Sequence, residues 1–138
     1  VTLNYPNPGI YTASVTAYAT NGSTLFQTKL KIKATAPTEL ASTVVGVYRS
    51  LIDRMSANNA TTALNLFVGD AQSRYAEMFN ALAGSLPSVA AQLGTPIDGV
   101  VTGDWAELTL VRPTADGDRV FLIYLIRGGD GLWRVESM

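Results

Sequence analysis

One carboxyl group and two hydroxyl groups occupy positions from which they could take part in chemistry. Asp53 follows Ile52 in a segment with the hydrophobic spacing of an amphipathic helix. Apolar neighbours can raise the pKa of such a carboxylate, which is typical of a functional group in a pocket. Tyr48 and Tyr124 could supply hydroxyls to the same pocket, and Phe79 could form an apolar wall. These five residues are therefore the candidates for a pocket that binds a small molecule or catalyses a reaction.

Each of these residues also has a simpler interpretation, which the sequence favours. Asp53 lies four residues after Arg49, so the two side chains could form a local ion pair on the solvent-exposed face of a helix. Tyrosines at core-facing positions normally bury the ring and leave the hydroxyl to one partner or to water. The sequence alone leaves both interpretations open.

A second set of candidates follows the strand pattern near the C-terminus. Glu107 lies two residues from Trp105, so both should share one face of a strand, and Arg112 and Arg127 alternate with apolar residues nearby. An acid and several arginines on one sheet face could bind an anion. Cross-strand charge pairs on a solvated or dimer-facing sheet explain the same residues more simply.

Two residue types are missing altogether. The chain has no cysteine, which excludes disulfides and thiol chemistry, and no histidine, which removes the commonest general base and metal ligand. Residues 116–118 and 128–131 hold aspartates and glycines but lack the ligand spacing of a calcium loop, so we expect hairpin turns there. We therefore expect no catalytic residue, no metal and no cofactor.

Charge divides the 138 residues into two parts. The formal net charge of −1 gives no general attraction to nucleic acid. The given sequence contains no run of 18 apolar residues, which is about the length that a membrane-spanning helix needs. All three lysines lie in the first 34 residues, whereas all eleven acidic residues follow Ala34. We expect one domain over residues 1–34 and a second over residues 35–138.

Residues 9–34 show the pattern of a β-hairpin. Apolar and polar residues alternate from Tyr11 to Ala19 and again from Phe26 to Lys33, which is the period of a half-buried strand. Asn21-Gly22 between them is a typical hairpin-turn dipeptide. A two-stranded hairpin is marginal in water, so this segment should pack against something else.

The rest of the chain predicts about four helices followed by four strands. The helices are expected over residues 39–57, 60–67, from the N-cap Asp70 to 83, and after the cap Ser85. Strands are expected over residues 97–101, 105–112, 119–127 and 132–136. Helices followed by an antiparallel meander predict an α+β domain, in which helices cover one face of a curved sheet.

Two resemblances refine this picture. The run Tyr5-Pro6-Asn7-Pro8-Gly9-Ile10-Tyr11-Thr12, with the alternation and turn that follow, resembles the last two strands of a polycystic-kidney-disease-type, immunoglobulin-like repeat. Residues 38–138 are similar to the nuclear transport factor 2-like (cystatin-like) superfamily. The segments that carry this second resemblance are Ala63-Leu64-Asn65-Leu66-Phe67, Ser73-Arg74-Tyr75, Phe121-Leu122-Ile123-Tyr124 and Asp130-Gly131-Leu132-Trp133-Arg134-Val135.

The second resemblance implies a cone-shaped sheet, closed by helices and often dimeric through its open face. That superfamily contains both enzymes and inert modules, so the resemblance leaves function open. We expect a non-enzymatic accessory or interaction module of a bacterial secreted or cell-surface protein, placed outside the cell or in the periplasm. Its partner would be another protein or a second copy. The alternative is a small-molecule-binding or enzymatic cone.

Overall fold

The computed structural model describes residues 7–34 and 37–138. The chain divides into two compact units, Val1–Glu39 and Leu40–Met138. Residues 1–6, which include Tyr5 and Pro6 of the immunoglobulin-like resemblance, and residues 35–36 lie outside the described residues.

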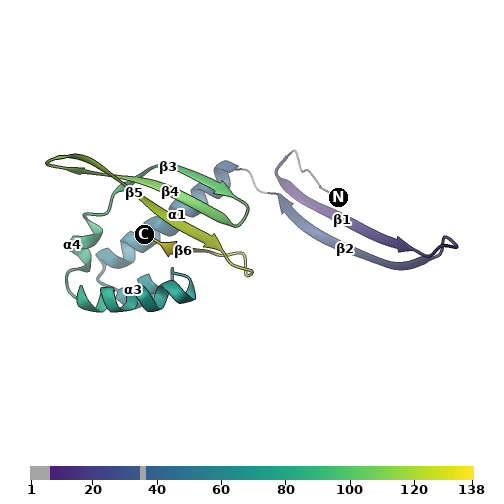
Figure 1. Ribbon diagram of the computed structural model, residues 1–138, viewed down its shortest axis with the longest axis horizontal. Coiled ribbons are helices and arrows are strands. Elements are labelled where there is room, and N and C mark those ends of the chain that lie inside the picture. The colour runs from purple at the N-terminus through teal and green to yellow at the C-terminus, as the bar shows by residue number, and fades with distance from the viewer. Residues whose placement is uncertain (1–6, 35–36) are drawn as a thin grey trace. The chain divides into compact units, whose positions relative to one another are not determined.

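The first unit is an antiparallel β-hairpin of strands β1 (Gly9–Tyr18) and β2 (Thr24–Ala34) (Figure 1). At the turn, the Ala19 amide donates to the Ser23 carbonyl, and the Asn21 side chain accepts from the Ser23 amide. Gly22 takes a positive φ of 81°. The predicted hairpin is confirmed, with a loop wider than a two-residue turn.

The hairpin has two unlike faces. Tyr11 pairs with Ile32 and Ala13 with Leu30 on the apolar face, whereas the alternate positions form the polar face. None of the described side chains of this hairpin is buried. Its described residues form two strands, so the immunoglobulin-like assignment stays a prediction.

The second unit begins with helix α1 (Pro37–Ser56). Val44, Tyr48, Leu51 and Met55 recur at intervals of three and four, and all four are buried. The helix ends before Asn58, which adopts a positive φ of 54°.

Three shorter helices follow α1. They are α2 (Ala60–Leu64), α3 (Gly69–Ala81) and α4 (Leu86–Ala90). The Asn59 side chain caps α2 by accepting from the Thr62 amide at 3.1 Å. The predicted caps of the next two helices are not formed: Asp70 lies inside the first turn of α3, and Ser85 makes no side-chain hydrogen bond at the start of α4.

A four-stranded antiparallel sheet completes the unit. Its strands, in spatial order, are β3 (Thr95–Thr102), β4 (Trp105–Thr114), β5 (Gly117–Arg127) and β6 (Trp133–Ser137). Residues 66–68 run beside β6, because the Val68 amide donates to the Val135 carbonyl and the Val135 amide donates to the Leu66 carbonyl. This pairing covers part of the β6 edge.

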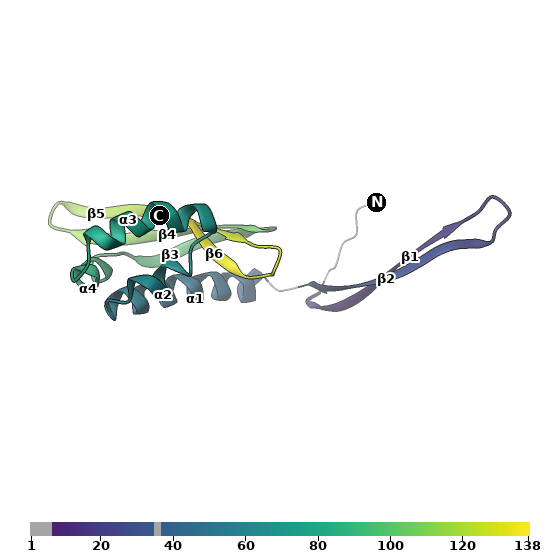
Figure 2. The same ribbon diagram turned by 90° about the horizontal axis from the view of Figure 1, so that it is seen from below.

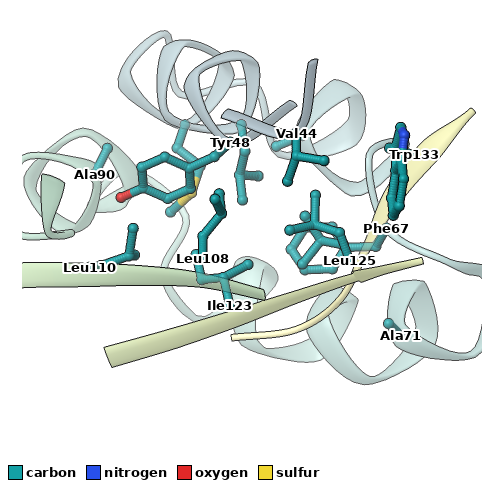
Figure 3. Close-up of a cluster of buried hydrophobic side chains, with 14 of the residues drawn as sticks. Val44, Tyr48, Phe67, Ala71, Ala90, Leu108, Leu110, Ile123, Leu125 and Trp133 are labelled. Carbon is teal, nitrogen blue, oxygen red and sulfur yellow. The ribbon is translucent and has the colours of Figure 1, made fainter. Parts of the chain in front are cut away.

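Side chains fill the space between the helices and one face of the sheet (Figures 1, 2 and 3). Tyr48 reaches from α1 toward Leu110, while Leu108 and Ile123 rise from the strands to meet it (Figure 3). Phe67 and Phe79 pack edge to face, with ring centroids 5.9 Å apart. The predicted α+β class, with an N-terminal hairpin and four helices on an antiparallel sheet, is confirmed.

Candidate functional site

The structure does not bring the five predicted pocket residues together. Phe79 is fully buried against Phe67 and Tyr75, inside the core. Tyr124 follows the buried Ile123 on β5, so its side chain projects from the opposite face of the sheet. Only Tyr48, Ile52 and Asp53 line a common hollow.

Tyr48 links helix α1 to the segment before β3. Its buried hydroxyl donates to the Gly94 carbonyl at 2.5 Å. Burial raises the pKa of Tyr48 to about 12, so the group is a neutral phenol at ordinary pH. The geometry makes Tyr48 a structural tie between two segments.

The hollow beside Tyr48 is open and has a volume of about 330 Å³. Asp53 is exposed at its rim, where it forms no ion pair with any side chain in the described part of the chain, Arg49 included. The predicted ion pair between Arg49 and Asp53 is therefore not formed. Asp53 is a solvated carboxylate and is not enclosed by apolar groups.

The sheet face that points away from the helices, here called the outer face, is rich in exposed apolar side chains. Trp105 and Val120 are 40% and 62% exposed, and Val100 is 54% exposed. Strand alternation places the following residues on this face: Val100, Trp105, Glu107, Thr109, Val111, Val120, Leu122, Tyr124, Ile126 and Arg134.

Three of these side chains meet toward the Trp105 end of the β4–β5 pair. Glu107 and Tyr124 are directly opposite each other on β4 and β5, so the Glu107 carboxylate is a close neighbour of the Tyr124 hydroxyl. Partial burial and this neighbouring negative charge raise the pKa of Tyr124. The Trp105 ring lies 5.7 Å from the Tyr124 ring. As predicted, Trp105 and Glu107 share a face.

The predicted ladder of Glu107 and arginines across one face is not formed. Arg112 is two residues from the buried Leu110 on β4, and Arg127 is two residues from the buried Leu125 on β5. Both arginines therefore lie on the helix-facing side of the sheet, at the margin of the core. Arg134, although on the outer face, is held by Asp130 at 2.6 Å.

The structure also brings together residues whose proximity the sequence pattern did not predict. Arg119 is directly opposite Arg112 in the β4–β5 pair. Phe121, Leu93 and Gln92 surround a small hollow beside these arginines. Cross-strand register could have identified the Arg112–Arg119 pair, but that register depends on the 115–116 turn, which periodicity alone does not define.

Within the described part of the chain, no three acidic side chains gather as a metal ion would require. None of its helices has both the length and the apolar character needed to cross a membrane.

Comparison with known proteins gives little similarity. The sequence matches no protein-family model and no curated protein. Among solved structures, it is similar to a Campylobacter jejuni protein that carries the name NTF2-like transpeptidase, with a TM-score of 0.43 and 12% identity. That match covers 75% of this chain and 100% of the other. A likeness at this level carries no argument here, so the fold assignment rests on the elements themselves.

Proposed function

We propose that the α+β unit is a non-enzymatic interaction module that associates with a second copy of itself through the outer face. The observation that carries the proposal is the group of exposed apolar side chains on this face, with Trp105 and Val120 at opposite ends of the β4–β5 pair. Contiguous apolar surface of this kind typically marks an interaction site.

The polar groups next to Trp105 on this face can be buried at little cost. Removing water from a carboxylate that has no polar neighbour is costly, but Glu107 is directly opposite Tyr124, whose hydroxyl is such a neighbour. Tryptophan and tyrosine are the residue types that most often dominate binding energy at interfaces. The face therefore combines aromatic anchors with an acid that has a tyrosine hydroxyl as its neighbour.

A second copy is the partner that we favour, because an isologous interface needs one patch that matches itself. Strands β4 and β5 form the middle of the sheet, and a two-fold axis along them would set β4 of one copy over β5 of the other. Trp105 and Val120 would then each meet apolar residues of the second copy.

Sedimentation velocity over a concentration series tests the proposal. We expect the wild-type chain to dimerise reversibly, and Trp105→Ala to weaken the dimer by about 2 kcal/mol or more because an aromatic anchor is lost. Val120→Glu should act in the same direction by placing a charge in the interface.

Met78→Ala is the matched control. Met78 is 40% exposed, as is Trp105, but lies on α3. It should leave the dimer unchanged. A wild-type chain that remains monomeric, or a dimer that tolerates both outer-face variants, would contradict the proposal.

We also propose, following the sequence resemblances, that the α+β unit is a nuclear transport factor 2-like domain and that the hairpin forms the last two strands of an immunoglobulin-like sandwich. The exposed apolar face of the hairpin supports the second assignment, since such a face is normally covered by a second sheet. A location at the bacterial cell surface, in the periplasm or outside the cell belongs to the same proposal.

A further inference from the structure

A small apolar hollow lies at the end of the core, on the side of the sheet that faces the helices. It has a volume of about 110 Å³ and is lined mainly by Leu93, Leu110, Phe121, Ile123 and Met138. Phe121 remains 43% exposed at its mouth, so the hollow opens to solvent beside an aromatic ring.

Arg112 lines this hollow, and Arg119 is its partner on the neighbouring strand. Arg112 and Arg119 are directly opposite each other on β4 and β5, two residues along the strands from the Leu110–Phe121 pair that lines the hollow. Like charges at directly opposed positions destabilise a sheet. Neither guanidinium forms an ion pair with a residue in the described part of the chain; Arg112 donates only to the neutral Gln92 side chain, at 3.1 Å.

Arg112 also lines a second, more open hollow of about 340 Å³. Gln92, Leu93 and Gly94 border both hollows. An apolar space and a solvated space therefore adjoin, with a guanidinium between them. This is the arrangement that an amphiphilic anion needs, with its tail in the small hollow and its head group at Arg112.

We propose that this site binds a small organic carboxylate with an apolar tail. The planar guanidinium matches a carboxylate with two parallel hydrogen bonds, and an anion there would relieve the repulsion between Arg112 and Arg119. Arg112 and Arg119 lie on the helix-facing side of the sheet, although Leu122 and Val111 of the outer face also border the hollows, so the site does not require the proposed self-association.

The size of the apolar hollow limits the tail. A cavity of about 150 Å³ lined by Leu, Ile and Phe can hold benzene. The hollow here is somewhat smaller but open at one side, so it suits a tail of about four to six carbons. Longer tails would extend past Phe121 into water, so the additional carbons would add little binding affinity.

Titration of the 138-residue chain with butanoate, pentanoate, hexanoate and octanoate, followed by two-dimensional amide NMR, tests both halves of the site. Each methylene buried should strengthen binding about fourfold until the hollow is full, after which affinity should level off. The amides of Leu93, Gly94 and Phe121 should shift most. Hexanol, which has the tail without the charge, should bind about tenfold more weakly than hexanoate, since hydrogen bonds to a charged group are lost.

The Arg112→Gln/Arg119→Gln double variant should remove the preference for hexanoate over hexanol. Arg127→Gln is the matched control, because Arg127 lies at the other end of β5 and should leave that preference unchanged. Circular dichroism establishes whether both variants are folded. If one is not, the titration of the wild-type protein with carboxylates of increasing tail length still tests the proposal. Affinity that does not depend on tail length, shifts confined to the outer face, or the absence of any shift would overturn the proposal.

Discussion

At the scale of single residues, the Tyr48 hydroxyl shows how a predicted functional group can have a structural role. It donates to the Gly94 carbonyl inside the protein, 46 residues away in sequence. Tyr48→Phe should therefore lower the free energy of unfolding by about 1 kcal/mol, the usual net worth of such a hydrogen bond. Urea denaturation measures the change. Tyr18→Phe, at an exposed tyrosine of β1, should have almost no effect; equal effects would contradict this role.

The same residue predicts a loss of stability at alkaline pH. Burial raises the pKa of Tyr48 from 10.0 to about 12. Between these values the unfolded chain loses the proton while the folded chain keeps it, so the free energy of unfolding falls as pH rises. Below pH 10 the proton is bound in both states, and this effect is absent. The wild-type chain should lose more stability than Tyr48→Phe between pH 10 and 12. Parallel curves for the two chains would show that Tyr48 is not the group responsible.

Asp130 predicts the opposite dependence, at acid pH. Hydrogen bonds from the Arg134 side chain and the Leu132 amide lower the pKa of Asp130 to about 2. The stabilisation is fully present above the usual pKa of 3.8 and is lost as pH falls through about 2, because the folded state must then take up the proton. Asp130→Asn should be less stable than wild type at neutral pH and equally stable near pH 2, as measured by thermal unfolding. Asp118→Asn serves as an exposed control on a neighbouring hairpin; a similar loss there would argue against a specific Asp130–Arg134 pair.

At the scale of elements, two glycines predict effects of opposite sign. A methyl group on Gly94, in the segment between α4 and β3, would lie 2.7 Å from the Val111 carbonyl oxygen. Gly94→Ala should therefore destabilise the unit by about 1–3 kcal/mol, because backbone must move. Gly46 lies inside α1 with nothing within 4 Å of the added methyl. Gly46→Ala should stabilise by about 1 kcal/mol through helix propensity. Chemical denaturation gives both values, and a neutral Gly94→Ala would mean that the α4–β3 segment adapts easily.

The elements themselves were largely predictable from the sequence, because each has a clear local signal. The three- and four-residue spacing of α1 and the alternation of β4 predicted both, close to their observed bounds. The prediction that Asp70 caps α3 was wrong, because the extended Val68 takes the N-cap position before this helix. Local pattern identifies an element more reliably than it identifies the residue at which the element begins.

The candidate site was less predictable, because it depends on contacts between elements. Tyr48, Ile52 and Asp53 lie on a single helix, and their common hollow follows from helical spacing. Tyr124 could be placed only by knowing which face of β5 packs on the helices. The opposition of Arg112 and Arg119 required the exact strand register. Periodicity identifies the two faces of a strand but does not say what covers each one.

At the scale of the whole molecule, the two units differ in the burial that holds each together. The α+β unit encloses a continuous cluster of buried side chains drawn from its helices and strands. The described hairpin residues contain no buried side chain, and Val15, Phe26 and Leu30 are all more than half exposed. Charge differs as well, since residues 1–34 carry three lysines and no acid, whereas the remainder has seven arginines against eleven acidic residues.

This difference in burial predicts two levels of hydrogen-exchange protection in one chain. An isolated two-stranded hairpin is marginally stable, so the amides of β1 and β2 should exchange through local opening at almost no cost. The amides of β4 and β5 should exchange only when the whole unit unfolds, and therefore orders of magnitude more slowly. Mass-spectrometric exchange on the intact chain compares the two strand pairs under identical conditions, with β4 and β5 as the internal control. Equal protection would mean that another surface covers the apolar face of the hairpin, and Leu30→Lys, which places a charge on that face, should then restore fast exchange in β1 and β2.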